Sequence, residues 1–565
     1  MDSVNFVINN RGDYGSLPDT VAERYQKILE RKYWNKSALN TLGGESFTYS
    51  QMATLIEKFH IFFDKAGLQK GQHIALWARN SARWGMSYLA VNTYEAVIVP
   101  ILADFTPESV ESLVNHSDSI ALLTNADKWA KLDIAKMPEV KVVMDVDNLK
   151  ILYCRKPEIE ALWNNIDNLL AEKYPDGFGP EDVVYPTDNM DDLAVINYTS
   201  GSTGNPKGVM LTYRNFSATI EYSQVHRPTS DKNRMISMLP MAHMYGLVTE
   251  FIYPLCNGTS IYWLGKTPTP STLMKAFQEV RPYQLITVPL VMEKIFKSKV
   301  KPVLDKPMIK ILTRIPGINT IIFKKIHDGL INAFGGEVGE FILGGAPVNP
   351  EIEKWFKKIK LPYTVGYGMT EATPLLAYAG SSEYVAGSCG KPVDCATVRI
   401  DSDDPRHIVG EIQAKGDNIC LGYYKNPEAS ADAFTEDGFL RTGDLGLFDD
   451  DGNLYIKGRS KSMILSANGQ NIYPEEVEAV VNSQPYVQES VVVDRASKLV
   501  ALVYLDQEAL RKDGLDQEEV SDLPERIRIN SDRQLPNYSQ IAKVEIVDQP
   551  FEKTPKMSIK RFLYK

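Results

Sequence analysis

"YTSGSTGNPKGVMLTYRNF" at residues 198–216 follows directly on an apolar run, LAVIN, at residues 193–197. Glycines let a backbone adopt positive φ and approach a ligand closely, and successive N–H groups in such a loop form an anion-binding concavity. Ser200, Ser202 and Thr203 add hydroxyl donors, and Lys207 adds a positive charge. The stretch therefore predicts a phosphate-binding loop that follows a buried strand.

The Walker A motif, GxxxxGK[ST], is the obvious competing interpretation of this loop. Counted from Gly201, the sixth residue is Pro206 and the residue after Lys207 is Gly208. The motif requires Gly at the first of these positions and Ser or Thr at the second, so an ordinary P-loop ATPase or kinase is disfavoured. The other alternative is a surface loop without a ligand, and the ordered series of hydroxyl residues and glycines argues against it.

Composition bounds the class of protein. The chain has 565 residues, 44% of them apolar and 24% charged, which predicts a folded protein with more than one domain. The net charge of −10 gives no global reason to bind nucleic acid, because that affinity comes mainly from Lys and Arg. It also argues against general adsorption to an anionic membrane, although it does not exclude a local basic patch.

Cysteine usage and the N-terminal residues predict the compartment. The five cysteines are scattered and form no CxxC pair, which is typical of a reducing compartment and argues against a disulfide framework or a zinc site. The opening residues, MDSVNFVINNRGDYG, do not resemble a signal peptide. No apolar run reaches the ~18 residues that a spanning helix needs. We therefore predict a cytoplasmic protein.

Short apolar runs alternate with helical patterns along most of the chain. Residues 48–63 begin with Thr48 and Gln51 at capping-box spacing and predict an amphipathic helix. Alternation of this kind is typical of βαβ units in a mostly parallel sheet. The predicted strands lie at 73–78, 96–101, 120–125, 193–198, 234–239, 285–289, 340–345 and 363–368.

Two changes of pattern divide the chain. From about residue 385 to 457 the sequence is rich in β-formers and turn residues, which predicts a small antiparallel sheet or barrel. After residue 460 the pattern becomes mixed, with strands at 490–494, 499–506 and 542–548. We expect an N-terminal domain at 1–460 and a small α+β domain at 461–565, joined by a linker whose Gly458 suits a hinge.

Five further segments stand in order around the loop. They are LPMAHMYG (239–246), LGGAP (343–347), GYGMTEATP (366–374), RTGDLG (441–446) and GRSKSMILSANGQNIYPEEVE (458–478). As a set, these six segments resemble the adenylate-forming superfamily, and the resemblance covers nearly the whole chain. It implies an α/β fold with two mostly parallel αβα subdomains, a small β-barrel and a mobile C-terminal α+β domain.

The resemblance also implies a reaction. Enzymes of this superfamily join a carboxylate to the α-phosphate of ATP and release pyrophosphate, so the site must neutralise phosphates and align the attacking oxygen. The loop would hold the β- and γ-phosphates, which belong to the leaving group. The matching positions are Thr199, Ser200, Gly201, Ser202, Thr203, Gly204 and Lys207.

The other motifs imply further roles. By resemblance, Thr370 contacts the α-phosphate and Glu371 helps to hold Mg²⁺, a cation that prefers oxygen ligands. Asp444 matches the aspartate that binds both ribose hydroxyls, and His243 matches a residue near the substrate carboxylate. The segments that contact adenine correspond to Tyr367, Gly344, Gly345 and Ala346.

The C-terminal segments imply movement. Lys461 matches the hinge residue about which the small domain swings, and Arg459 precedes it. Gly469 matches a loop that lines the tunnel for the pantetheine arm of CoA. The chain departs from the common ending T-x-x-G-K-I-x-R, because Ser558 occupies the lysine position. Lys556 or Lys560 would have to supply the bridging ammonium group, and Lys556 is favoured.

Two segments resemble long-chain fatty acyl-CoA synthetases, VPLVMEKIFKSKVKPVL (288–304) and residues 420–446. A fatty acid is therefore the expected substrate, with ATP, Mg²⁺ and CoA. An amino acid would need a buried carboxylate for its ammonium group, and no clear candidate follows LPMAHMYG. Transfer to an acyl carrier protein and a catalytically silent binder stay open as alternatives. Residues 294–325 are basic and apolar, which suggests peripheral contact with a membrane surface.

Overall fold

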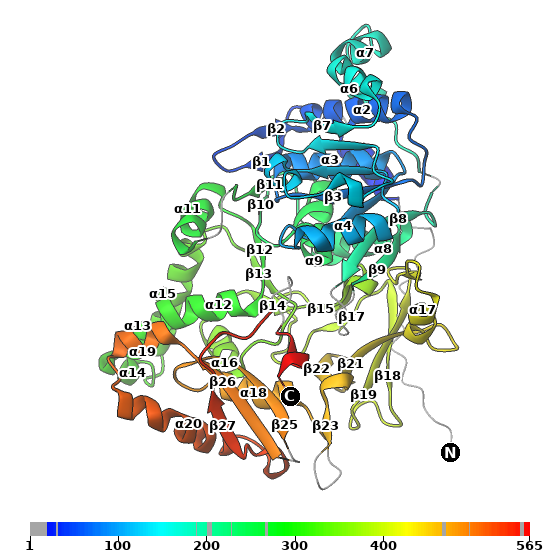
Figure 1. The fold of residues 1–565 in the computed structure, drawn as a ribbon. Helices are drawn as coiled ribbons and strands as arrows, with labels where there is room; N and C mark the ends of the chain where they lie inside the picture. Colours follow the sequence, from blue (N-terminus) through cyan, green and yellow to red (C-terminus); the bar gives the residue numbers. More distant parts are fainter. Residues whose placement is uncertain are drawn as a thin grey trace.

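The computed structural model describes residues 20–29, 32–187, 189–199, 206–227, 229–265, 269–465, 471–495, 498–553 and 559–564. Within these residues the chain builds two large sheets, two small antiparallel sheets and a separate group of C-terminal strands (Figure 1). In Figure 1 the chain passes from blue at the top, through green, to orange and red at the bottom.

The first large sheet contains eight strands among the described residues and is parallel through its centre. In spatial order they are β20 (Gly422–Tyr423), β9 (Lys207–Thr212), β8 (Leu193–Thr199), β4 (Val97–Pro100), β3 (His73–Trp77), β5 (Ala121–Thr124), β6 (Val142–Asp145) and β7 (Ile151–Cys154). The central strands are the apolar runs that the sequence predicts, and they are fully buried apart from their ends. Burial on both faces is what makes such runs continuous rather than alternating.

The second large sheet contains seven strands in the described part of the chain, and all but its edge pair are parallel. Its order is β14 (Tyr363–Val365), β13 (Glu340–Leu343), β12 (Gln284–Thr287), β10 (Arg234–Ser237), β11 (Ser260–Trp263), β1 (Ser37–Thr41) and β2 (Ser46–Thr48). The mostly parallel architecture predicted from the alternating pattern is confirmed.

Helices cover these sheets and connect their strands. The principal ones are α1 (Val21–Ile28), α2 (Tyr49–Ala66), α3 (Ala82–Thr93), α4 (Pro107–His116), α5 (Ala126–Trp129), α6 (Pro157–Asn164), α7 (Ile166–Lys173), α8 (Tyr213–His226), α11 (Pro270–Val280), α12 (Pro289–Ile295), α13 (Lys301–Leu304), α14 (Pro307–Leu312), α15 (Ile318–Ala333) and α16 (Pro350–Lys358). The capping box predicted at Thr48 and Gln51 begins α2, where each residue satisfies a backbone N–H of the other.

Two antiparallel sheets form the β-rich segment expected near residues 385–457. The three-stranded sheet contains β15 (Tyr367–Gly368), β16 (Leu375–Tyr378) and β17 (Lys391–Pro392), and the four-stranded sheet contains β18 (Ala396–Asp401), β19 (Gly410–Gly416), β21 (Leu440–Phe448) and β22 (Leu454–Arg459). The short helix α17 (Pro427–Ala433) leads into β21. These sheets begin two strands earlier than the composition change indicates, because β15 and β16 both precede residue 385.

The C-terminal residues have their own core. They comprise β23 (Ile464–Leu465), β24 (Asn471–Ile472), α18 (Pro474–Asn482), β25 (Val487–Arg495), β26 (Lys498–Leu505), α19 (Gln507–Asp513), α20 (Gln517–Asp532) and β27 (Lys543–Ile546). Residues of α18, α20 and the three-stranded sheet share one apolar cluster that contains no residue before Ile464. The strands predicted at 490–494, 499–506 and 542–548 are confirmed as β25, β26 and β27.

The motifs gather at one edge of the sheets. The carboxyl ends of β8, β10, β13 and β14 lead into the segments at 198–216, 239–246, 343–347 and 366–374, respectively. In open α/β sheets, ligands bind outside the carboxyl ends of the strands. The topology therefore brings together segments that are far apart in the sequence.

Candidate functional site

The phosphate loop connects two strands of an antiparallel hairpin. Thr199 at the end of β8 pairs with Lys207 at the start of β9, and Ser200, Gly201, Ser202, Thr203 and Gly204 lie outside the described residues. In a Walker A site the loop opens a helix, whose N-terminus supplies the phosphate contacts. Here a strand follows the loop, which independently separates this site from the P-loop class.

Lys207 and Glu371 lie on either side of one tyrosine. The Nζ of Lys207 stands 4.7 Å from the centre of the Tyr423 ring, and the Tyr423 hydroxyl donates to Oε1 of Glu371 at 3.0 Å. Tyr423 reaches this place because β20 pairs with β9 beside the loop. Tyr423 was not predicted from the sequence as a site residue, although it belongs to the segment 420–446, which resembles long-chain fatty acyl-CoA synthetases.

A short 3₁₀ helix, Thr370–Ala372, places Thr370 and Glu371 directly after β15. Both residues are buried, and the backbone carbonyl of Glu371 accepts from the N–H of Cys420 at 2.9 Å. Gly368 makes this turn feasible, since a Cβ there would lie 1.7 Å from the carbonyl oxygen of Pro374. The backbone of Glu371 is therefore fixed, and its carboxylate is held by the Tyr423 hydroxyl.

Asp444 is a buried carboxylate between two strands. The Tyr367 hydroxyl donates to its Oδ2 at 2.8 Å, and Nε of Arg459 lies 2.9 Å from its Oδ1. Burial raises the pKa of Asp444, while Arg459 and Tyr367 oppose that rise. Each carboxylate oxygen has two lone pairs, so both can accept one further hydrogen bond from a ligand.

The segment after β13 approaches the segment after β10. Gly344 is buried, and a Cβ at that position would lie 2.9 Å from the hydroxyl and Cζ of Tyr245. Gly345 has φ of +81° and is exposed, as is Ala346. A larger residue at position 344 would therefore displace the Tyr245 ring, which makes the contact between the two motifs specific for glycine.

His243 begins the helix α9 (Met244–Gly246). Its Nδ1 accepts from the backbone N–H of Tyr245 at 3.1 Å, so in the neutral ring Nε2 carries the proton. The backbone of the preceding turn is also tied to the first sheet, because the Asn197 side chain donates to the carbonyl of Ala242 at 2.9 Å. His243 is thus held by the same strand, β8, that leads into the phosphate loop.

Glu250 is a buried carboxylate that the sequence analysis did not find. It lies in the π-helical segment Leu247–Ile252, which continues into α10 (Tyr253–Cys256), and its exposed fraction is 0%. Burial raises its pKa to about 8, although three hydrogen bonds lower it. The sequence offers no clear candidate after LPMAHMYG for a carboxylate that would bind a substrate ammonium group, but the structure shows that a buried carboxylate does follow this motif. A single Glu in an apolar run gives no signal of its burial.

The remaining predicted residues lie toward the C-terminus. Lys461 is exposed in the 3₁₀ turn Ser460–Ser462. Nζ of Lys560 lies 3.2 Å from Oε2 of Glu552, so this ammonium group is engaged within its own domain. Gly469 and Lys556 lie outside the described residues.

The site fits a cation that arrives with phosphate ligands. Among the described residues, no group of three or more His, Cys, Asp or Glu side chains could hold a metal ion. Glu371 offers one buried carboxylate beside Lys207 and the phosphate loop. Mg²⁺ is commonly held by one or two carboxylates together with substrate phosphates and waters, which agrees with this arrangement.

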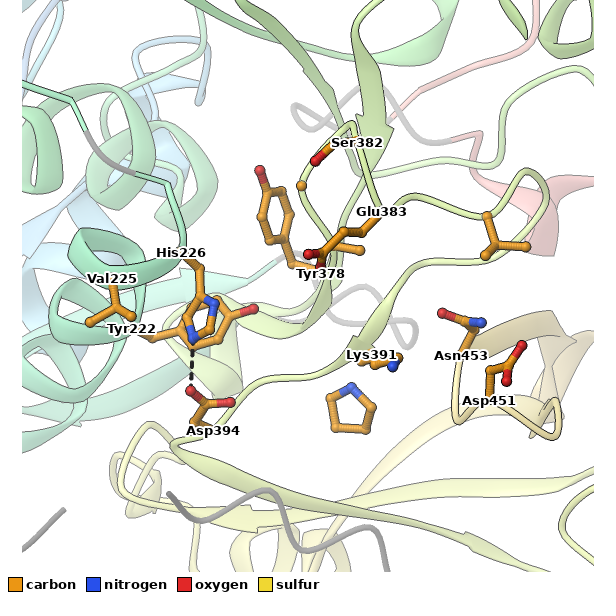
Figure 2. A pocket seen from close by; sticks show the side chains of 14 residues that line it. Tyr222, Val225, His226, Tyr378, Ser382, Glu383, Lys391, Asp394, Asp451 and Asn453 are labelled. Carbon is orange, nitrogen blue, oxygen red and sulfur yellow. Dashed lines mark hydrogen bonds and ion pairs between the residues drawn. The ribbon is translucent and has the colours of Figure 1, made fainter. Parts of the chain in front are cut away.

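A separate cavity of about 670 Å³ lies away from these residues (Figure 2). Its lining comes from the end of α8, the end of β16 and the turn before β22, and it includes the pair His226 and Asp394, which are 2.8 Å apart. None of the site residues predicted from sequence lines this cavity. The candidate site is therefore the edge where the motifs meet.

Comparison with known proteins gives the class. The model of the AMP-binding enzyme family matches residues 26–424, and that of the AMP-binding enzyme C-terminal domain matches residues 461–564. The chain therefore belongs to the AMP-binding enzyme family.

Comparison with individual named proteins is more specific than the family match. The chain is 26% identical over 553 residues to the long-chain-fatty-acid–CoA ligase ACSBG2 of Mus musculus, covering 90% of this chain and 80% of that protein. It is 29% identical over 476 residues to long-chain-fatty-acid–CoA ligase 5 of Rattus norvegicus, covering 78% and 68%, respectively. ATP-bound MatB from Rhodopseudomonas palustris has the same fold, with a TM-score of 0.75 at 22% identity over 97% of this chain and 98% of that one.

Proposed function

We propose that this protein is an AMP-forming acid–thiol ligase that activates a fatty acid with ATP and transfers the acyl group to CoA. The observation that carries the proposal is the convergence of Lys207, Tyr423 and Glu371 beside the phosphate loop. Two anions must meet in the first step, and a lysine beside a carboxylate that can hold Mg²⁺ supplies the required neutralisation. The names of the curated relatives support a fatty acid, and a long-chain one, as the acid.

The described residues divide the first step between them. We assign the leaving β- and γ-phosphates to the loop with Lys207, the α-phosphate to Thr370, and the ribose hydroxyls to Asp444. The segment at Gly344 to Ala346 and Tyr367 would hold adenine. Glu371 would hold Mg²⁺ bound to ATP, and that cation supplies further neutralisation of the phosphates. With the nucleotide fixed, the fatty acid carboxylate near His243 attacks the α-phosphorus in line with the departing pyrophosphate.

The second step requires a thiol to reach the acyl carbonyl. We propose residues 1–460 and 461–565 as two domains that reorient about Lys461, with Gly469 lining the path of the pantetheine arm. The separate apolar core of the C-terminal residues supports a unit that moves as one body. For the bridging lysine of the first step we propose Lys556, and the engagement of Lys560 by Glu552 supports this choice.

ATP–pyrophosphate exchange tests the first step. The account predicts exchange that depends on a fatty acid and on Mg²⁺, with acyl-AMP and pyrophosphate as the products of this step. Orthophosphate release without any acid would instead favour an NTPase. Nucleotide binding without exchange for any acid tested would support a catalytically silent binder.

A basic and apolar surface favours a second proposal, contact with an anionic membrane. Across α14 and α15 the side chains of Met308, Ile311 and Ile321 are 71%, 64% and 59% exposed. Exposed basic residues stand in the same stretch of a chain whose net charge is −10, namely Lys297, Lys299, Lys301, Lys306, Lys310, Arg314, Lys324 and Lys325. Exposed apolar and basic side chains in one segment match the interface of an anionic bilayer. No helix of the described residues is long and apolar enough to span a membrane.

We expect the protein to co-sediment with vesicles of anionic phosphatidylglycerol at low salt and to remain in solution with phosphatidylcholine vesicles. Replacing Met308, Ile311 and Ile321 with Ser should weaken binding by at least about 100-fold, because burying each such side chain contributes about 1.5–3 kcal/mol. The matched control replaces Val184 and Ile408, exposed by 74% and 54% on other segments, and should bind as the wild type does. A wild-type protein that stays in the supernatant with anionic vesicles would contradict the proposal.

A further inference from the structure

Glu250 holds the turn that carries His243. A single carboxylate oxygen, Oε2, accepts hydrogen bonds from the Ser237 hydroxyl at 3.0 Å and from the N–H groups of Met238 at 3.0 Å and Leu239 at 2.9 Å. These donors stand where β10 ends and the chain leaves the sheet. The carboxylate therefore satisfies backbone groups that have lost their strand partner, which would otherwise be costly to bury.

The next residues of the turn are fixed from two other directions. The Asn80 side chain donates to the carbonyl of Leu239 at 2.8 Å and accepts from the N–H of Met241 at 3.1 Å. Asn197 holds the carbonyl of Ala242 at 2.9 Å. Three side chains from three separate elements thus fix residues 238–242, and Glu250 holds the end nearest the strand.

Two residues of the candidate site directly follow this turn. His243 follows it immediately, and the Tyr245 ring closes against Gly344 in the segment assigned to adenine. Glu250 itself lies further along the chain, within the π-helical segment Leu247–Ile252. π-Helical segments are rare and frequently occur at functional sites, which fits a carboxylate turned back toward its own turn.

We propose that Glu250 is a positioning residue for the acid substrate, acting through the turn at 238–243 rather than by touching the reacting atoms. The inference rests on the proposed function. The observation that carries the positioning role is that Oε2 accepts three hydrogen bonds from the residues that precede His243. The other oxygen, Oε1, is buried and has no hydrogen-bond partner among the described residues. Loss of the carboxylate should displace the turn, and displacement near the reacting carboxylate is costly to catalysis.

The chain offers a matched control. Glu353 in α16 is also buried, and its Oε1 also accepts three hydrogen bonds, from the hydroxyls of Tyr363 at 3.2 Å and Tyr384 at 2.8 Å and from the N–H of Gly387 at 3.2 Å. It has the same chemistry as Glu250 but serves a different part of the molecule. Comparing the two separates positioning from general stability.

We expect E250A to lower kcat/KM for the fatty acid at least ~10-fold while the KM for ATP stays within about 2-fold, because the turn carries the acid side of the site. E250Q should stay within ~3-fold of the wild type, since its carbonyl oxygen accepts the same three hydrogen bonds. E353A should lower the unfolding temperature without lowering kcat/KM for the fatty acid selectively relative to the KM for ATP. If E250A does not fold, N80A tests the same turn and should show the same split to a smaller extent.

Three results would overturn the inference: E250A and E353A changing the kinetics alike, E250A leaving the kinetics at wild-type values, or E250Q losing as much activity as E250A. Failure of the proposed function is distinguishable from these. In that case the wild type itself would show no acid-dependent AMP formation, whereas failure of the positioning role requires an active wild type.

Discussion

E371Q is expected to lower the rate of AMP formation by about 100- to 1000-fold, the range seen when one electrostatic stabiliser of a transition state is removed. Tyr423 links the Glu371 carboxylate to Lys207, because its hydroxyl donates to Glu371 and its ring lies under the lysine ammonium group. The amide keeps the size and can still accept from the Tyr423 hydroxyl, so the loss is specific to the negative charge. Steady-state AMP formation at several Mg²⁺ concentrations measures the effect.

Y423F is the matched control for this prediction. It removes the hydroxyl that donates to Glu371 but keeps the ring under Lys207. Its activity should fall by about 10-fold, because a hydrogen bond to a charged group contributes about 1.5 kcal/mol at the lower end of its range. An E371Q protein that retains activity within about 3-fold of the wild type would contradict the assignment of Glu371 to Mg²⁺.

R561A is expected to destabilise the C-terminal domain by about 3 kcal/mol, since removing one partner of a buried ion pair leaves a buried charge uncompensated. Arg561 contacts Oε2 of Glu478 and lies 3.7 Å from Glu475. Glu478 is 7% exposed, and its Oε1 accepts from the N–H of Val492 at 2.6 Å. Thermal and urea unfolding measure the loss, and the double variant R561A/E478Q should recover most of it.

The loss of folding stability in R561A should also depend on pH. Burial raises the pKa of Glu478 to about 7 from its ordinary value of 4.5, and Arg561 opposes that rise. A carboxyl whose pKa is raised in the folded state contributes stability below its unfolded pKa, and this contribution is lost as pH rises through the folded pKa. Without Arg561 the pKa of Glu478 in the folded state rises further. The variant therefore continues to lose stability as pH rises above 7. The deficit should therefore be larger at pH 8 than at pH 5.5, and an equal deficit at both would contradict this account.

Strands were the most predictable part of the fold, because runs such as residues 73–78 and 193–198 are apolar throughout and bounded by polar or turn residues. Local patterns of this kind reflect burial on both faces of a sheet. The hairpin between β8 and β9 was not predicted. A glycine-rich loop gives no local signal for the direction of the chain that follows it, and the pairing is a tertiary property.

The carboxyl ends of β8, β10, β13 and β14 lead into four of the motif segments, while the residues that support the motifs could not be found from sequence. Tyr423 reaches Glu371 across 52 positions, and Arg561 reaches Glu478 across 83. Glu250 stands in the run LVTEFIYPL, where one acidic residue is equally compatible with an exposed helix face. Its burial depends on β10 packing beside the helix, which periodicity does not encode.

The most direct test of the central claim is product analysis by mass spectrometry after incubation with ATP, Mg²⁺ and fatty acids from short to long, with and without CoA. The account predicts AMP and acyl-CoA in equal amounts, formed only when both the fatty acid and CoA are present. The rate should be highest with one of the longer fatty acids. A thioester that forms only when an acyl carrier protein is added would show that the acceptor is the carrier protein and not CoA. Absence of both AMP and acyl-CoA with every acid would contradict the account.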